Sequence, residues 1–253
     1  MDPTSETPEL TPDEALDRLG RVRLTEHSMR SLLEEIAVMA TNSLPGKVES
    51  SVTLLTGDDA VTAVYTGAMS LELDERQYGL GSGPCLHAAT HGEPVEIVDT
   101  RSDPRWPEFV KTAVQHGCGS SLSLPLPLHE GVSGALNIYA RRPAAFDEPS
   151  RGFARRFASY GAVVAGNMLV YESALDRAKN LEAALASRAV IDQAKGILME
   201  RFKLTPDQAF RALARISMES NTKVRDVAER FVATGEWDQA HPVPADRDVR
   251  TRS

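Results

Sequence analysis

Hydrophobic and polar positions follow two different patterns along this chain, and the change falls near Pro149. Before that point, short β-type runs are separated by turn residues. One run, SVTLLTGDDAVTAVYTG (51–67), has a Gly-Asp-Asp turn in its middle and predicts a β-hairpin. The order of the elements predicts an α+β domain with a central antiparallel sheet and flanking helices. Further strands are predicted at 94–99, 120–128 and 132–140, and helices at 26–44 and 105–117.

After Pro149 the strand pattern disappears and helical periodicity takes over. No proline interrupts residues 150–205, so one or two long helices can run through this stretch. Part of it has apolar and small residues at three- and four-residue spacing, as in the seam of a coiled coil. We therefore expect a homodimer formed through residues 171–187. The seam consists of Tyr171, Ala174, Ala178, Leu181 and Leu185.

The C-terminal part of the chain predicts three short amphipathic helices, which together form an all-α module over residues 188–235. The second helix begins with a T-x-x-Q capping box, in which Thr205 is the N-cap and Gln208 follows three residues later. Asn221 or Thr222 is expected to cap the third helix.

One glycine lies inside the first helix of this module, in RAVIDQAKGILMERF (188–202). A glycine in a helix interior costs roughly 1 kcal/mol relative to alanine. The apolar stripe of the helix includes Ala194 and Leu198, and helical geometry places Gly196 nearly opposite that stripe. Two interpretations remain open: another molecule approaches the bare backbone, or a second helix crosses it closely.

Composition and charge narrow the class of protein. The chain is 42% hydrophobic, which is ordinary for a globular protein, and its net charge of −8 argues against non-specific adhesion of the whole chain to nucleic acid or anionic membrane. Residues 187–234 differ, since nine Lys or Arg outnumber six Asp or Glu there, a net charge of +3. We expect a flexible N-terminal segment at 1–24 and a flexible tail at 236–253.

No run approaches the roughly 20 apolar residues of a membrane span, and the acidic N-terminus has no apolar signal segment. These features predict a cytoplasmic protein without a membrane partner. With only two cysteines in a reducing compartment, a disulfide framework is not expected.

The first part of the chain offers few candidates for catalysis. The glycines of GLGSGPCLHAATHG (79–92) follow neither the G-x-G-x-x-G nor the GK[ST] pattern, so they predict a loop over a pocket. Cys85, His87 and His91 have no evident fourth ligand, and no metal is predicted. Cys85 and Cys118 are either buried small hydrophobic residues or a redox pair. No Ser/His/Asp or paired-carboxylate arrangement stands out, and the protein is not expected to be an enzyme.

The helical module is the stronger candidate for binding. Basic, amide and hydroxyl side chains gather around the glycine and at the start of the third helix, where a helix N-terminus favours anions. Such residues suit contact with a phosphate backbone, although a solvated charged face is the other interpretation. The candidate binding residues are Arg188, Lys195, Gly196, Met199, Asn221, Thr222, Lys223 and Arg225.

Residues 187–232 resemble an ANTAR domain, the RNA-binding output module of bacterial transcription antiterminators. Three motifs carry the resemblance: AKGILM (194–199), QAF (208–210) and NTKVRDVA (221–228). The resemblance implies a three-helix unit, dimerised by a preceding coiled coil, that binds paired RNA hairpins in transcript leader regions and prevents a terminator from forming.

The ANTAR resemblance also assigns residues. It places Ala194, Lys195 and Gly196 on the RNA-facing helix, and Asn221 and Lys223 at the adjacent helix start. The chain departs from the family in its second helix. Where the family often has Leu-Arg, this sequence has Leu213-Ala214; the neighbouring Arg215 is a substitute turned by about 100° around the helix, and we include it among the RNA-binding candidates.

Residues 26–170 resemble a GAF domain through YGLGSGPCLHA, EIVDTRSDPRWPEF, GCGSSLSLPL and GALNIYA. The resemblance implies a central antiparallel sheet with a pocket for a small ligand, such as a cyclic nucleotide, a tetrapyrrole or a metabolite. The cofactor or effector itself is unknown. The candidate pocket residues are Cys85, His87, Asp99, Trp106 and Cys118.

The resulting domain assignment is a GAF sensor at 25–170, a helical coiled-coil linker at 171–187 and an ANTAR domain at 188–235. The leading hypothesis is a dimeric regulator in which a ligand or redox change in the GAF pocket biases RNA binding. A second hypothesis keeps the sensor but gives it a DNA-binding or protein-docking output. A third is a thiol-dependent methionine sulfoxide reductase of the GAF type that uses Cys85 with Cys118.

Overall fold

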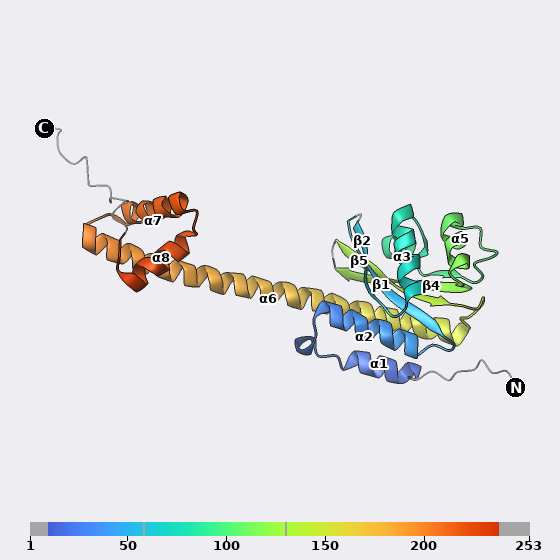
Figure 1. The fold of residues 1–253 in the computed structure, drawn as a ribbon. Helices are drawn as coiled ribbons and strands as arrows, with labels where there is room; N and C mark the ends of the chain where they lie inside the picture. Colours follow the sequence, from blue (N-terminus) through green and yellow to red (C-terminus); the bar gives the residue numbers. More distant parts are fainter. Residues whose placement is uncertain (1–9, 58, 130, 238–253) are drawn as a thin grey trace. The chain divides into compact units, whose positions relative to one another are not determined.

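The computed structural model describes residues 10–57, 59–129 and 131–237 and divides into two compact units, Met1–Ser173 and Ala174–Ser253 (Figure 1). The first unit is built on a five-stranded sheet of order β2-β1-β5-β4-β3, in which every neighbouring pair is antiparallel. The hairpins predicted at β1–β2 and β4–β5 are confirmed. The strands are β1 (Val48–Thr56), β2 (Asp59–Tyr65), β3 (Val95–Ile97), β4 (Ser120–His129) and β5 (Val132–Ala140).

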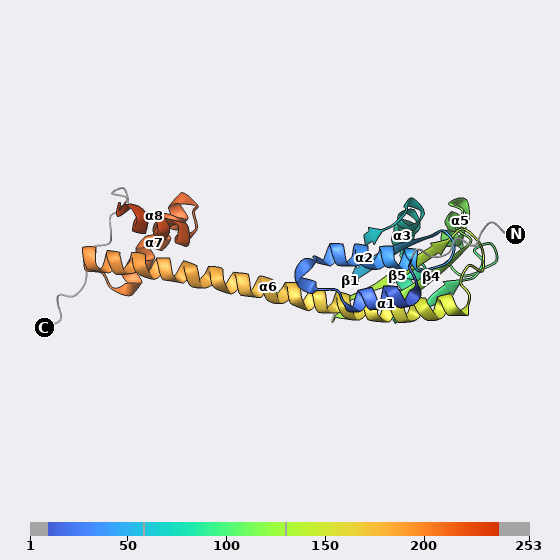
Figure 2. The same cartoon turned by 90° about the horizontal axis from the view of Figure 1, so that it is seen from below.

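One face of the sheet packs against α2 (Met29–Asn42) and the beginning of α6 (Glu148–Phe202), and α1 (Pro12–Gly20) packs against α2 on this side of the sheet (Figure 2). Alternate residues of the strands, such as Leu122 and Ile138, meet the apolar side of these helices in the main core of this unit. The core explains why α2 and the first turns of α6 are amphipathic, since each buries one stripe on the sheet.

The other face is covered by α3 (Ala68–Leu80), α4 (Pro84–His91) and α5 (Pro107–Gln115). The sequence pattern does not single out α3, because this helix buries polar residues as well as apolar ones.

The expectation of a flexible segment over residues 1–24 is wrong for its described part. Thr11 and Glu14 form a reciprocal capping box at the start of α1. Ala15 and Leu19 are buried in the main core, which holds α1 against α2. Residues 1–9, and 238–253 of the expected C-terminal tail, lie outside the described residues.

The second unit is helical, as predicted, and contains the end of α6 together with α7 (Pro206–Ser220) and α8 (Val224–Thr234). It has its own core, in which Leu198 meets Leu213 and Phe231. The capping box at Thr205 is confirmed, but the predicted cap of α8 is wrong. Lys223 is the N-cap and makes no side-chain capping bond, because its ammonium group has no acceptor. Asn221 instead adopts a left-handed conformation (φ 49°) and is the C-cap of α7.

One continuous helix, α6, spans Glu148–Phe202 and contributes to both cores. No helix in the part of the chain that the structure describes is both long enough and apolar enough to cross a membrane.

Candidate nucleic-acid interface and sensor core

The sheet face beneath α3, α4 and α5 carries a buried row of polar side chains. Ser51, Asn137 and Ser123 are paired in register across β1, β5 and β4. Thr53 and Tyr139 extend the same face along β1 and β5, since alternate residues of a strand share a face. All five residues, which we call the polar sheet face, are fully buried.

Asp74 of α3 directs its carboxylate to this face. The Tyr139 hydroxyl donates a hydrogen bond of 2.5 Å to Asp74 Oδ1, and Asn137 Nδ2 donates one of 3.3 Å to the same atom. Thr62 Oγ1 donates to Asp74 Oδ2 over 3.2 Å. Among residues 10–57, 59–129 and 131–237, no Lys or Arg forms an ion pair with Asp74, so hydrogen bonds alone stabilise its charged form.

Burial raises the pKa of Asp74 to about 6, although hydrogen bonds involving Ser51 and Tyr139 act in the opposite direction. Burial also raises the pKa of Tyr139, and the charge of Asp74 adds to that effect. The carboxyl group of Asp74 therefore changes its charge within a pH range that cells reach.

The network continues from α3 to α4. Gln77 Nε2 donates to the Tyr139 hydroxyl over 3.2 Å, while Gln77 Oε1 accepts from the backbone N–H of Cys85 at 2.8 Å. A Cβ atom on Gly83 would lie 2.3 Å from Gln77 Oε1, so a larger residue at the start of α4 would displace the Gln77 side chain. The glycine-rich loop predicted from the sequence is therefore a turn that lets these two helices share hydrogen bonds.

Three buried polar atoms near this network have no hydrogen-bond partner within the described residues: Asn137 Oδ1, Ser121 Oγ and Ser123 Oγ. An unsatisfied buried polar group costs about 1–3 kcal/mol. Bound water or a small polar ligand is the usual source of the missing bond in such places.

The predicted pocket residues are only partly brought together. His87 lies against Trp106, with ring centroids 5.7 Å apart, and Trp106 packs on the clusters that contain Cys85 and Cys118. Asp99 instead accepts a hydrogen bond of 2.9 Å from the backbone N–H of Arg101, which stabilises its own loop.

Cys85 and Cys118 are both buried, unpaired with each other, and belong to different apolar clusters. Burial raises the pKa of the Cys85 thiol well above its ordinary value and that of Cys118 to about 12. Both thiols are therefore poor nucleophiles in this conformation. The described residues also contain no group of three or more His, Cys, Asp or Glu placed to hold a metal ion.

Sequence reasoning missed Asp74, Asn137 and Tyr139. A signal was available, because polar residues alternate along the strands at Ser121 and Ser123. Such alternation ordinarily indicates a solvated face, whereas here α3, α4 and α5 cover it.

In the helical unit, Gly196 lies on the exposed side of α6. A Cβ atom added there would meet no atom within 4 Å, so no helix of this unit crosses it closely. Ala194 is fully buried in the core of the unit. The expectation that Ala194 contacts RNA is therefore corrected, because its methyl group packs beneath the surface that Gly196 leaves open.

Asp192 lies between two of the predicted cations. Its carboxylate is 3.0 Å from Lys195 Nζ and 3.7 Å from Arg188 Nε. The Lys195 side chain is 25% exposed and that of Arg188 is 82% exposed. Met199 is partly buried against the core of this unit.

The turn between α7 and α8 presents a second set of predicted residues. Lys223 is exposed and forms no ion pair with any described residue, whereas Arg225 lies 3.2 Å from Asp226 and 3.5 Å from Glu229. Thr222 Oγ1 donates to the backbone oxygen of Ser220 over 3.1 Å, which fixes the turn. The remaining predicted residues of this set are the exposed Asn221 and the half-buried Arg215.

Comparison with family models gives two matches. The model of the GAF domain matches residues 26–164, and the model of the ANTAR domain matches residues 179–232. The chain belongs to the GAF–ANTAR family. Its sheet and flanking helices are the GAF domain, and α7, α8 and the end of α6 are the ANTAR domain.

One solved structure supports the GAF fold, and a second is reported as a similarity alone. A phycoerythrobilin-bound GAF domain from a cyanobacterial phytochrome is similar with a TM-score of 0.51 and 11% identity, over 64% of this chain and 98% of that one. A free methionine-R-sulfoxide reductase from Neisseria meningitidis, in complex with its substrate, has a TM-score of 0.47 and 18% identity, over 62% of this chain and 91% of that one. No match was found among curated proteins.

The domain pair defines the class of the protein. A GAF sensor domain joined to an ANTAR RNA-binding domain is the architecture of a sensor-regulated RNA-binding regulator, and it is typical of regulators rather than enzymes.

Proposed function

We propose that this GAF–ANTAR protein is a ligand-responsive antiterminator, in which two ANTAR domains hold paired hairpins of a nascent transcript and keep a terminator from forming. The observation that carries the proposal is the open backbone at Gly196 beside Lys195. A glycine that its own fold leaves uncovered, next to an amine, suits close approach of a sugar–phosphate chain.

In this proposal RNA competes with Asp192 for Lys195 and Arg188. A phosphate oxygen takes the place of the carboxylate on each cation, so the ion pairs seen in the free protein are exchanged rather than simply lost. Lys223 has no such competitor among the described residues and is available to a second stretch of the same RNA.

The exposed middle of α6 supports the proposed pairing of two ANTAR domains. Leu181 and Leu185 are 62% and 59% exposed, one helical turn apart on the same face, which suits a parallel coiled coil with a second copy. Tyr171, the first residue of the predicted seam, packs instead against the core of the GAF domain. We therefore place the start of the coiled coil at Ala174.

The polar sheet face is the part of the GAF domain we propose for the effector. Its unpartnered atoms, such as Asn137 Oδ1, suit a small polar ligand with hydrogen-bond donors. Asp74 has no cationic partner among the described residues, so its charge disfavours an anionic ligand. A purely redox response has little support, because both cysteines are buried and their pKa values are raised.

Recovery of cellular RNA cross-linked to the full chain tests the proposal. We expect enrichment of transcript leaders with two adjacent short hairpins, and we expect that a recovered RNA outcompetes duplex DNA in binding. A duplex that competes better than the RNA would support the alternative of a DNA-binding output, and recovery of no RNA would overturn the proposal.

A further inference from the structure

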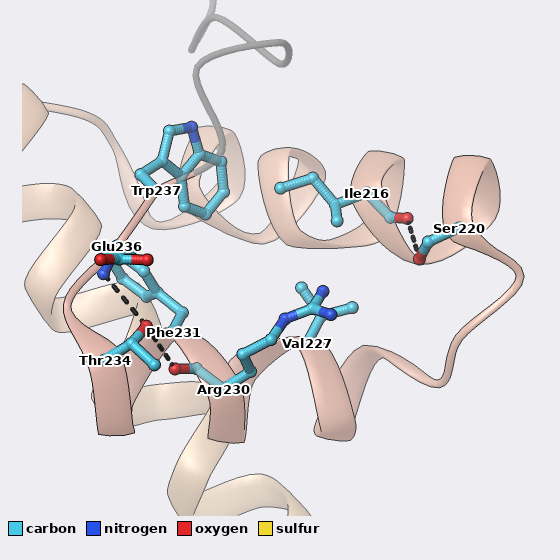
Figure 3. Close-up of a pocket in the computed structure, with 8 residues that line it drawn as sticks. All are labelled: Ile216, Ser220, Val227, Arg230, Phe231, Thr234, Glu236 and Trp237. Atoms are coloured by element: carbon cyan, nitrogen blue, oxygen red, sulfur yellow. Dashed lines mark hydrogen bonds between the residues drawn. The ribbon is translucent and has the colours of Figure 1, made fainter.

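A cleft in the ANTAR domain opens between α7 and α8 and includes none of the candidate RNA-binding residues predicted from the sequence (Figure 3). Its volume is about 470 Å³, which is within the range of small-molecule sites. Ile216, Val227 and Phe231 form a buried apolar floor. The rim includes Arg230, Glu236 and Trp237.

Aromatic contacts position the rim residue Trp237. Its ring lies 5.1 Å from that of Phe231 at an angle of 82°, and 6.3 Å from that of Phe202. This edge-to-face arrangement anchors the indole over the floor while the residue stays partly exposed. The partly exposed indole of Trp237 therefore places an aromatic ring at the rim of the cleft.

The two charges at the rim do not pair with each other. Arg230 is exposed, and its guanidinium forms no hydrogen bond or ion pair with any described residue; Figure 3 shows it beside Val227, away from Glu236. The Glu236 carboxylate likewise has no partner among the described residues. The Arg230 guanidinium thus offers several hydrogen-bond donors at the rim, and the Glu236 carboxylate separately offers two acceptor oxygens.

We propose that this cleft binds an unpaired base of the RNA, and that guanine is the base it prefers; the inference rests on the proposed RNA-binding function. An arginine fork pairs with guanine O6 and N7, and a carboxylate accepts from guanine N1–H and the N2 amino group. The aromatic surface of Trp237 stacks on the ring. A bare phosphate fits less well, because Glu236 repels it.

Fluorescence of the full chain with Trp106→Phe tests the inference, since Trp237 is then its only tryptophan. The probes are the RNA nonamers U4GU4 and U9 at fixed salt. We expect U4GU4 to quench Trp237 and to bind about tenfold more tightly than U9, the scale of one stacked and hydrogen-bonded base. Replacing guanine by inosine, which lacks the N2 amino group, is expected to remove much of that preference.

Binding of labelled RNA nonamers to the native chain and to two arginine variants distinguishes recognition at the cleft from general attraction by positive charge. We expect Arg230→Ala to reduce the preference for guanine to about twofold or less. Arg211→Ala removes the same charge from an exposed position of α7 outside the cleft and is expected to leave the preference intact.

Three results would overturn the inference: equal binding of U4GU4 and U9, equal effects of Arg230→Ala and Arg211→Ala, or a shift of Trp237 emission without RNA when residues 238–253 are deleted. The last would mean that the chain's own C-terminal segment occupies the cleft. If hairpin RNA is recovered from cells but guanine gives no preference, the cleft inference alone fails. If guanine is preferred but no cellular RNA is recovered, the antitermination proposal fails instead.

Discussion

At Gly196 an added methyl group would meet no atom within 4 Å, so the fold itself has no steric use for glycine there. Gly196→Ala should stabilise the ANTAR domain by about 1 kcal/mol, because alanine is the better helix former. We expect the same change to weaken RNA binding, since the methyl group holds the phosphate chain away from the backbone. Denaturant unfolding and RNA titration of one preparation measure both effects.

The control for this prediction is Gly152→Ala, another α6 glycine with nothing within 4 Å of an added Cβ atom. It should stabilise the GAF domain and leave RNA affinity unchanged. Undiminished RNA affinity in Gly196→Ala would remove the functional reason for that glycine.

Asp74 makes the stability of the GAF domain dependent on pH. Its pKa is about 6 in the folded chain against an ordinary 3.8, so between pH 4 and 6 the folded state binds the proton more tightly than the unfolded state. Stability from this group is present below about pH 4 and is lost as pH rises through 6, by up to about 3 kcal/mol.

Asp74→Asn removes this titration. We expect its unfolding midpoint relative to the native chain to rise between pH 4.5 and 7.5, followed by Trp106 fluorescence in a Trp237→Phe background. A difference in midpoint that does not change with pH would mean that the carboxyl group is already charged, or stays neutral, across the whole range.

At the scale of elements, the first part of α6 is buried in the core of the GAF domain, whereas its middle, around Leu181, is exposed. Leu181→Glu should dissociate the proposed dimer, because it places a charge in the seam of the proposed coiled coil. Ala183→Glu adds the same charge two residues away, on the opposite side of the helix, and should leave the dimer intact. Sedimentation velocity distinguishes them, and equal masses for both variants would exclude Leu181 from the interface.

The elements differ in how well their sequences predict them. The β1–β2 and β4–β5 hairpins and the capping box at Thr205 depend on local rules of periodicity and turn chemistry, and these predictions are confirmed. The start of α8 was predicted wrongly, because the left-handed Asn221 ends one helix where a cap for the next was expected. Local patterns do not show which of two helices a polar residue serves.

The candidate sites likewise include features that local sequence rules predict and features that depend on tertiary packing. Exposure of Gly196 follows from the angle between residues of one helix, so sequence alone predicts it. The environment of Asp74 depends on hydrogen bonds to Asn137 and Tyr139, more than sixty residues away along the chain, and no spacing rule brings them together. Burial of Ala194 beneath Gly196 likewise requires knowledge of what packs on the helix.

For the whole molecule, the separation of charge predicts how RNA binding responds to salt. Residues 187–234 carry +3 within a chain of −8, so binding should be local to this segment. If Arg188, Lys195 and Lys223 of two protomers each neutralise one phosphate, log Kd plotted against log salt has a slope of magnitude about 4, and about 2 for a monomer. Titration of the native chain and of Leu181→Glu at several salt concentrations measures both slopes, and equal slopes would contradict binding by paired modules.

The central claim is that the surface around Lys195 and Gly196 binds RNA. The most direct measurement compares the affinity of Lys195→Ala and Lys179→Ala for an RNA recovered with the native chain. Both lysines pair with an aspartate three residues earlier on α6, so both variants lose the same charge and the same kind of ion pair. We predict that Lys195→Ala weakens binding at least about tenfold while Lys179→Ala changes it less than about twofold. Equal affinities of the two variants would contradict the account.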